Sequence, residues 1–425
     1  MRLRSLVFVL AWVATFPVLL AAQTNYRVVT LPGLGGVFGY ANSINNRGWA
    51  SGQADYTGDN VGHASLWVNE SGAIDLGAFG GPTANSAVAW PVIATTGVIV
   101  GISDTAEDQP FSNNAFSCWP FYPPFAPTGK VCRGFRWQNN TMTPLSPFAG
   151  GFNSYATAAN NRGQIVGWAE NEVHDPTCDP AFQVLQFRAV IWQPDGTMQE
   201  LLPLPGNSTS AATAINDLGQ VVGISGTCGM AVGSVSAAHA VIWNNGIPTD
   251  LGNLGGDAWN TPAAISNQGV VVGFANTVPG TARTFQAFIW TSATGMQLLP
   301  VPADAIRSEA LGINGKGQVV GLVRLPSGLD AVIWQNGTMT DLNSVTLAGS
   351  PILLYANDIN DSGEIVGEAL DPATGDEPAY RAIPLPGNSS STPHQKVGQN
   401  IPLSPERLDK LERRAFPLST DSTHY

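Results

Sequence analysis

Charge is scarce in this chain. Only 12% of its 425 residues are charged, and 19 Lys and Arg residues stand against 31 Asp and Glu residues, for a formal net charge of -12. An acidic surface repels a phosphate backbone. The composition therefore disfavours nucleic acid as a partner.

Residues and motifs of metal and nucleophile chemistry are also few. The chain has five His and four Cys, with no HExxH, His-x-His, CxxC, GxSxG or P-loop pattern. His174, beside Asp175 and Asp179, is the nearest approach to a metal group, and a solvated loop is the favoured interpretation. Segment 358–364 is similar to a calcium loop but coincides with a repeated turn. We predict no metal, no cofactor and no catalytic residue.

Long apolar runs are missing after the N-terminus. Arg2 and Arg4 precede an apolar stretch over 6–20, and small residues at 21–22 are suited to cleavage. This layout predicts a secretory signal peptide over residues 1–22. An uncleaved anchor is the alternative, although the apolar stretch is short for a membrane span. We expect a secreted, extracellular or periplasmic protein without a membrane span after signal removal.

Helical periodicity is absent from the repeats as well, and the chain instead contains a repeated sequence motif. Each copy has a small apolar stretch, a turn containing Gly and usually Asn, and an aliphatic run closed by Gly. A sequence motif that recurs at intervals of about 45–65 residues is typical of solenoids and propellers. The seven copies end at the following glycines: Gly52, Gly101, Gly167, Gly223, Gly273, Gly321 and Gly367.

Two further strands complete each unit. A strand ending in Trp follows the closing Gly in six units, and a short strand such as 249–252 comes after a tight turn. Four strands per unit predict an all-β fold, a seven-bladed β-propeller of four-stranded blades. We expect the tryptophans to pack between blades: Trp67, Trp137, Trp192, Trp243, Trp290 and Trp334.

The ends of the repeat region are incomplete in complementary ways. Tyr26–Leu31 matches a fourth strand without its unit, and Tyr380–Ile383 matches a third strand that lacks Trp. We predict that these two segments pair and close the ring, which removes free sheet edges. The propeller then spans 23–384, and a disordered Ser/Pro-rich tail spans 385–425.

These residues resemble the HAF repeat of exported bacterial proteins, named for a His-Ala-Phe before the Trp strand. Parts of that signature stand at 63–64, 239–240 and 287–288, and segment 251–269 is the best match to the rest. The resemblance implies a secreted β-propeller-like domain and supplies no activity. The His is replaced in several units, so it is no required ligand; Arg188, Gln286 and Asp330 stand there.

Polar residues at repeated positions have structural interpretations. We predict that His63 and His239 cap strands. The Asp of the fourth strand is expected to pair with turn amides, because equivalent residues of different blades are dispersed around the ring. These aspartates are Asp75, Asp250 and Asp341.

The insertions after the second strand differ most between units, and all four cysteines lie in them. In an exported chain an even number of cysteines favours disulfides. We predict that Cys118 pairs with Cys132 within one insertion, and that Cys178 pairs with Cys228 between neighbouring units.

The longest insertion carries aromatic residues outside the repeat pattern. Trp119, Phe121, Tyr122 and Phe125 lie in a Pro-rich segment and are the candidate ligand-binding residues. A small satellite cluster over the propeller is the alternative for them.

The functional prediction is a secreted, non-catalytic binding or scaffold propeller. We expect it to be a monomer that recognises an extracellular glycan or protein through loops on one face. The alternative is a carbohydrate-active hydrolase or lyase with its site at the mouth of the central channel. A convergent cluster of carboxylate, His or Tyr residues in one pocket would favour the enzyme.

Overall fold

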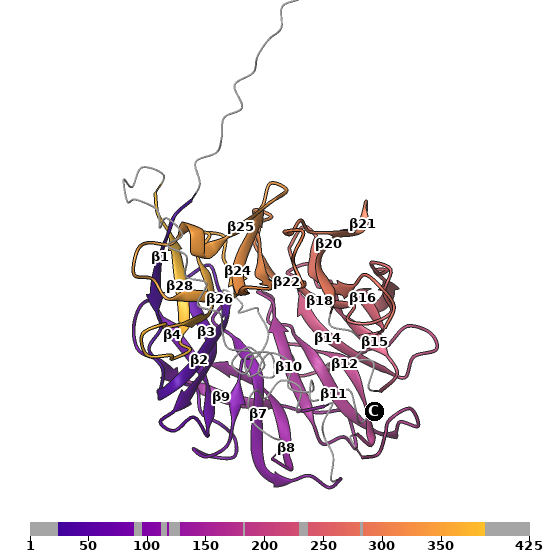
Figure 1. Ribbon diagram of the computed structural model, residues 1–425. Coiled ribbons are helices and arrows are strands. Elements are labelled where there is room, and N and C mark those ends of the chain that lie inside the picture. Colours follow the sequence, from indigo (N-terminus) through magenta and orange to yellow (C-terminus); the bar gives the residue numbers. More distant parts are fainter. Residues whose placement is uncertain are drawn as a thin grey trace, which may run out of the picture.

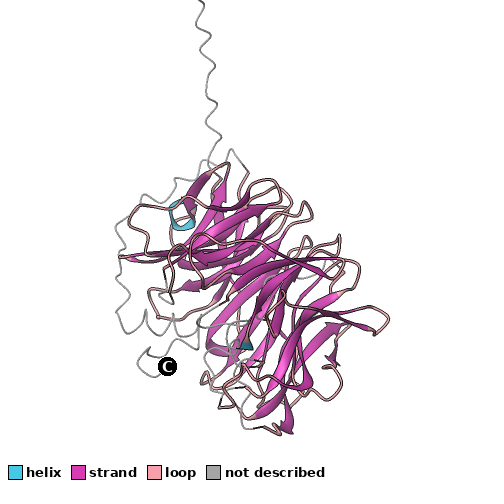
Figure 2. Cartoon of the chain, turned by 90° about the vertical axis from the view of Figure 1, so that its right-hand side faces the viewer, coloured by secondary structure: helices cyan, strands magenta, loops and turns pink. Residues whose placement is uncertain are grey.

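Seven antiparallel sheets of four strands follow one another around a ring in the computed structural model (Figure 1). The structure describes residues 24–88, 96–111, 117–118, 128–181, 183–228, 237–280 and 284–386. Figure 2 shows that strands make up nearly all of the drawn elements. Helix is confined to short pieces such as the 3-10 helix η2 (Leu342–Val345). The predicted seven-bladed propeller is confirmed.

Blades are numbered here along the chain, and the first strand of each lies innermost. Blade 1 consists of β2 (Gly35–Ile44), β3 (Trp49–Tyr56), β4 (Gly62–Val68) and β5 (Ile74–Asp75). Blade 2 consists of β6 (Ser86–Ala87), β7 (Ile99–Asp108), β8 (Lys130–Gln138) and β9 (Thr141–Leu145). Blade 3 consists of β10 (Ser154–Ala159), β11 (Ile165–His174), β12 (Leu185–Trp192) and β13 (Met198–Leu201).

The remaining blades repeat this order. Blade 4 consists of β14 (Thr209–Ile215), β15 (Val221–Gly226), β16 (His239–Asn244) and β17 (Ile247–Asp250). Blade 5 consists of β18 (Thr261–Ile265), β19 (Val271–Asn276), β20 (Phe285–Thr291) and β21 (Gly295–Leu298). Blade 6 consists of β22 (Arg307–Ile313), β23 (Val319–Leu325), β24 (Gly328–Gln335) and β25 (Thr338–Asp341). Blade 7 consists of β26 (Ile352–Ile359), β27 (Ile365–Leu370), β28 (Ala379–Pro384) and, outermost, β1 (Tyr26–Thr30).

The ring closes where the two ends of the repeat region meet. β1 pairs antiparallel with β28, from Tyr26 opposite Pro384 to Thr30 opposite Tyr380 (Figure 1). The backbone of Leu31 donates to Ala379 O at 2.8 Å and extends the ladder. The predicted closure is confirmed. The predicted signal peptide and residues 387–425 of the predicted tail lie outside the described residues.

The repeated turns between the first and second strands of the blades lie at one end of the propeller, which we call the hairpin rim. In blade 3 the Asn160 Oδ1 atom accepts from the backbone N–H groups of Arg162 and Gln164, at 3.1 and 3.0 Å. Its Nδ2 atom donates to Asn216 O of blade 4 at 3.0 Å. One side chain thus shapes its own turn and binds the next blade.

This asparagine contact recurs around the rim. Asn216 donates to Ser266 O, Asn314 to Asn360 O, and Asn360 to Asn45 O across the closure seam, at 3.0, 3.0 and 3.1 Å. We call these side chains the asparagine belt: Asn45, Asn160, Asn216, Asn314 and Asn360, with Ser266 in the blade 5 position.

The tryptophans of the third strands join neighbouring blades, as predicted. The indole N–H of Trp243 donates to Leu202 O, which follows the outer strand of blade 3, at 2.7 Å. The same bond links three other tryptophans to the preceding blade: Trp67 to Pro32 O, Trp192 to Ser146 O and Trp334 to Pro300 O. Most of each indole is buried, so both its apolar surface and its N–H stabilise the contact between blades.

Candidate functional site

The other end of the channel, where the insertions leave the sheets, is called here the insertion rim. Strand register places one pair of side chains from each blade just beyond the closing Gly of the repeat. Tyr40 lies opposite Gln53 in blade 1, and Tyr355 lies opposite Glu368 in blade 7. The same position in blade 3 holds Tyr155 opposite Trp168, and their rings stack with centroids 4.4 Å apart.

In each pair the tyrosine lies on the innermost strand of its blade and its partner lies on the second strand. Blade 2 has only Ala87 at this position, and Ala87 belongs to the same buried cluster as Tyr155. Burial, and then the charge of the Tyr40 group in blade 1, raise the pKa of Tyr155 in blade 3. We call this group the channel cluster: Tyr40, Gln53, Asp55, Tyr155, Tyr355 and Glu368, all buried.

A chain of hydrogen bonds runs through the blade 1 part of the cluster. The Tyr40 hydroxyl donates to Gln53 Oε1 at 2.9 Å, and Gln53 Nε2 donates to Asp55 Oδ1 at 3.0 Å. Burial, and then the negative charges of Asp55 and Glu368, raise the pKa of Tyr40 far above its ordinary value. Tyr40 is therefore a neutral phenol that donates a proton in hydrogen bonds across the physiological range.

Phenol donors beside carboxylates are the groups that general acid–base chemistry requires. A carboxylate accepts a proton or activates water, and a buried phenol stabilises an oxygen that gains negative charge. Asp55 comes from the second strand of blade 1, whereas Glu368 comes from the second strand of blade 7. The cluster thus depends on the closure seam between these two blades.

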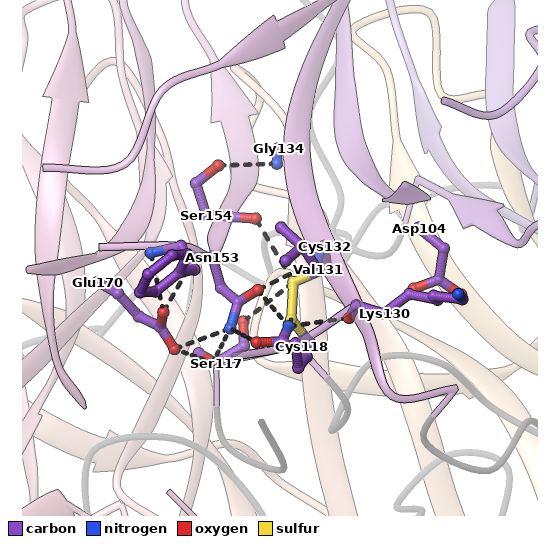
Figure 3. Close-up of a disulfide and its surroundings, with 12 residues drawn as sticks. Asp104, Ser117, Cys118, Lys130, Val131, Cys132, Gly134, Asn153, Ser154 and Glu170 are labelled. Carbon is purple, nitrogen blue, oxygen red and sulfur yellow. Dashed lines mark hydrogen bonds between the residues drawn. A yellow bond between two sulfur atoms is a disulfide. The ribbon is translucent and has the colours of Figure 1, made fainter. Parts of the chain in front are cut away.

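Glu170 of blade 3 anchors the longest insertion beside the channel (Figure 3). It is 3% exposed, and its carboxylate accepts from Ser117 Oγ at 2.7 Å, Asn153 Nδ2 at 2.8 Å and Gln183 Nε2 at 3.0 Å. The backbone N–H groups of Phe152 and Asn153 donate to its other oxygen. Five donors offset the cost of burying this carboxylate.

Asp104 of blade 2 stands at the position that Asp55 holds in blade 1, and lies beyond the disulfide in Figure 3. Its Oδ2 atom accepts from Thr128 Oγ1 at 3.2 Å. Burial raises the pKa of Asp104 to about 6, although the bond from Thr128 opposes the shift. Equivalent positions of neighbouring blades therefore hold carboxylates in different environments.

Both predicted disulfides are present. Cys118 is bonded to Cys132, with 5.9 Å between their Cα atoms, and Cys178 to Cys228, with 4.9 Å. The first lies beside the Glu170 network (Figure 3), and the second joins the insertions of blades 3 and 4. Such bonds persist in oxidising compartments, so the chain belongs outside the reducing cytosol. Within the described residues, no helix has the length and apolarity needed to span a membrane.

The structure does not test the predicted ligand-binding aromatics. Trp119, Phe121, Tyr122 and Phe125 lie outside the described residues, so their role stays a prediction. The adjacent Ser117 is held at the channel, since Trp168 Nε1 donates to its carbonyl at 3.1 Å.

The repeated aspartates pair with turn amides, as predicted, and two of them also contact the repeated histidines. His63 Nδ1 lies 2.8 Å from Asp75 Oδ1, and His239 Nδ1 lies 2.9 Å from Asp250 Oδ2. The turn amides of Gly77, Gly252 and Asn343 donate to the repeated aspartates. Burial opposes ionisation of Asp75, but the hydrogen bonds from His63, Tyr56 and Gly77 lower its pKa to about 2.

The predicted solvated loop residue His174 contacts an aromatic side chain. Its ring meets Phe111 edge to face at 5.8 Å, and the neighbouring Asp175 accepts from Thr177 and Thr209. In the part of the chain that the structure describes, no three His, Cys, Asp or Glu side chains gather as metal ligands.

Sequence reasoning missed the channel cluster, although a signal for it exists. Tyr followed by Ala stands five residues before the turn Asn in three units, at Tyr40, Tyr155 and Tyr355. By strand register, the equivalent residues in the other units are Ala87, Ala211, Thr261 and Glu309. A bulky polar residue at a position that elsewhere tolerates Ala marks a departure from what the blade itself needs.

Neither family models nor curated proteins match this chain. Among solved structures, an acylaminoacyl peptidase from Pyrococcus horikoshii is 10% identical, with a TM-score of 0.46, over 82% of this chain and 52% of that one. The β-propeller domain of the Trilobed protease from Pyrococcus furiosus is 10% identical, with a TM-score of 0.46, over 83% of this chain and 99% of that one. A puromycin hydrolase is 12% identical, with a TM-score of 0.44, over 83% and 52%.

These neighbours correct the functional prediction. They are a peptidase, a protease domain and a hydrolase, which overturns the prediction of a non-catalytic binding or scaffold propeller in favour of its alternative. The chain spans about half the length of the peptidase and of the puromycin hydrolase, at 52% of each. At these identities the likeness is one of fold, and no residue role passes from them to this chain.

Proposed function

We propose that this chain is a carbohydrate-active hydrolase or lyase whose site is the channel cluster at the insertion rim. The observation that supports the proposal is the hydrogen-bonded chain from the buried Tyr40 through Gln53 to Asp55 in blade 1, with the Glu368 carboxylate on the adjoining blade 7. The repeat does not require Tyr40 or Glu368, because blades 2 and 4 build the same strands with Ala and Ile at the equivalent positions.

The proposed roles follow from the environment of each group. Glu368 and Asp55 are the acid–base pair: in hydrolysis one protonates the leaving oxygen while the other activates water. Tyr40, kept neutral by burial and by the carboxylates, donates a hydrogen bond to the oxygen that gains charge. Gln53 positions both Tyr40 and Asp55 through its amide.

Export through a signal peptide over residues 1–22 belongs to the same proposal, as does membership of the HAF-repeat family. Two disulfides support folding in an oxidising compartment. N-terminal sequencing of the exported protein tests the cleavage site: a mature chain that begins near Gln23 is expected, and a retained leader would contradict it.

A substrate screen tests the activity. The full chain is incubated with a panel of neutral and acidic polysaccharides, and new reducing ends and unsaturated products are measured. We expect turnover of one class of substrate, reduced at least about a hundredfold in Asp55→Asn and in Glu368→Gln, because general acid–base groups contribute rate factors of this size.

The matched control for this screen is Asp104→Asn. Asp104 occupies the position of Asp55 in the next blade and is also buried, but its carboxylate accepts from Thr128, whereas Asp55 accepts from Gln53. Its variant is expected to retain activity. Turnover that survives both cluster substitutions in folded protein would contradict the proposal.

A further inference from the structure

A cavity of about 150 Å³ lies at the seam between blades 1 and 7. Its walls include the segment that enters β2 and the connection between β27 and β28, which belongs to the insertion rim. Two backbone hydrogen bonds hold these walls together: Gly39 N donates to Glu377 O, and Glu377 N donates to Val37 O, both at 2.9 Å. Val37 lines the cavity and is 52% exposed, so the cavity opens to solvent.

The cavity adjoins the channel cluster. Phe38 lines it, and the Phe38 ring meets the Tyr40 ring edge to face, with the two centroids 5.8 Å apart. Ala54 also lines the cavity, and it stands between Gln53 and Asp55 in β3. A saccharide chain bound at the channel cluster can therefore place a neighbouring sugar unit in the cavity.

The sequence leaves this cavity unfilled at Gly33. A Cβ atom added there would lie 3.8 Å from Gly36 O and 3.9 Å from the Ala54 Cβ atom, which are ordinary contact distances to two residues of the wall. Gly33 is not among the glycines with a left-handed backbone, so its conformation does not require glycine. A cavity of about this volume accommodates a six-membered ring such as benzene. The cavity therefore has room for one sugar ring.

The chemistry of the walls favours a cation carried on a compact organic group. Asp371 and Asp376 line the cavity, and its lining residues include no Lys, Arg or His among those the structure describes. The Asp371 Oδ1 atom accepts from Ala373 N at 2.8 Å, whereas the Asp376 carboxylate accepts no hydrogen bond from a described residue. Apolar wall residues such as Phe38 and Pro378 suit the C–H groups of a ring. The net charge of -12 also attracts cationic ligands.

We propose that this cavity binds the ammonium group of an amino sugar, so that the preferred substrate of the channel site is a hexosamine chain with free amino groups. The inference rests on the proposed function. The sugar ring packs on the apolar wall, and its ammonium donates charge-assisted hydrogen bonds to Asp371 and Asp376. An N-acetylated chain, which is neutral, is a weaker substrate, and the two carboxylates repel a uronate.

Isothermal titration of the full chain with a glucosamine trimer, at a pH where its amines are protonated, tests the site. We expect saturable binding that weakens about tenfold when the amines are acetylated, because the charge-assisted hydrogen bonds are lost. Asp371→Asn and Asp376→Asn should each reduce this preference, and Gly33→Leu should weaken binding of both trimers because its side chain occupies the cavity. Asp195→Asn, which removes the same charge from the turn between β12 and β13, is the control and should bind as the parent does.

The readouts separate this inference from the proposed function. Binding is also measured in Glu368→Gln, which should retain the preference for the amine while losing turnover; turnover that survives with the preference intact would contradict the proposed function alone. Equal affinity of the parent chain for both trimers would overturn the inference without touching the turnover result, and so would an unchanged preference in the two aspartate variants. Tighter binding of a lysine tripeptide than of the glucosamine trimer would overturn the assignment to a saccharide.

Discussion

The two rims of this propeller are built on opposite principles. At the hairpin rim, the same asparagine contact recurs from blade to blade, and its partners are the backbone groups of the next turn. At the insertion rim, equivalent positions hold Tyr, Ala, Thr or Glu, and buried charges gather on some blades only.

The difference separates structure from function within one repeat. A contact that every blade needs is repeated, because each blade must bind its neighbours in the same way. A side chain that only blades 1, 3 or 7 possess at the axis does not serve the blade itself. Hence the channel cluster stands out from the repeat, whereas the tryptophans and belt asparagines do not.

Removal of the closing strand β1 is expected to cause the largest loss of stability. Deletion of residues 23–31 removes the buried Tyr26 and Leu31 and exposes an edge of blade 7. Each of these side chains contributes about 1.5–3 kcal/mol by burial, so the loss should be about 3–6 kcal/mol of unfolding free energy. Denaturant melts of the truncated and parent chains measure it, and coincident curves would rule the closure out.

Loss of the Glu170 carboxylate is expected to cause the second-largest loss of stability, because five hydrogen-bond donors depend on it. Glu170→Leu should destabilise the fold by about 3–5 kcal/mol, the usual cost of breaking a buried charged network. Glu170→Gln, which keeps one acceptor oxygen, should cost less, and the exposed neighbour variant Glu172→Gln should cost almost nothing. A small effect of Glu170→Leu on the melt would mean that the insertion rim does not depend on this network.

The closure seam also carries a pH-dependent contribution from Asp358. Its buried carboxylate accepts from Ile44 N and Ser43 Oγ of blade 1, at 2.9 and 3.3 Å. Burial raises the pKa of Asp358 to about 7 from an ordinary 3.8, although these bonds oppose the shift. The protonated form therefore favours the fold, and its stabilisation is lost as pH rises through 7.

The measurement is unfolding free energy between pH 4.5 and 8. The parent should lose about 1–4 kcal/mol across this window relative to Asp358→Asn, which has no carboxyl to ionise. Asp75 does not interfere, because its lowered pKa affects stability only below about pH 4. Parallel pH profiles for the two proteins would show that Asp358 does not titrate at the seam.

A single belt asparagine should have the smallest effect. Asn216→Ala removes the caps on two turn amides and the bond to Ser266 O, for a cost of about 1–2 kcal/mol. Asn216→Ser should cost less, because Ser266 fills the equivalent place in blade 5. Thermal melts compare the two variants; equal losses would mean that a side-chain acceptor for the turn amides contributes nothing.

The fold was predictable from the sequence because its determinants are local and repeated. The turn Asn, the closing Gly and the strand-ending Trp recur in most units, and the unmatched Tyr26–Leu31 segment indicated how the ring closes. The pairing of the four cysteines followed from their insertions. Each inference needed only neighbours within a unit or between adjacent units.

The candidate site was not predictable in the same way. Dispersal of equivalent residues around the ring, which argued against catalysis, holds for outer strands such as the one that carries Asp75. Inner strands behave differently, since they surround the axis of the ring, where Ala87 of blade 2 and Tyr155 of blade 3 belong to one buried cluster. That convergence depends on the number of blades and on small residues such as Ala87, which no single unit reveals.

The most direct test of the account compares one substitution on each rim of blade 7. Glu368→Gln alters the channel cluster, and Asp361→Asn alters the hairpin rim, where Asp361 accepts from Asn46 and Gly315. With the substrate found in the polysaccharide screen, kcat should fall at least about a hundredfold in Glu368→Gln and stay near the parent value in Asp361→Asn. Equal kcat values in both folded variants would contradict a catalytic role for the insertion rim.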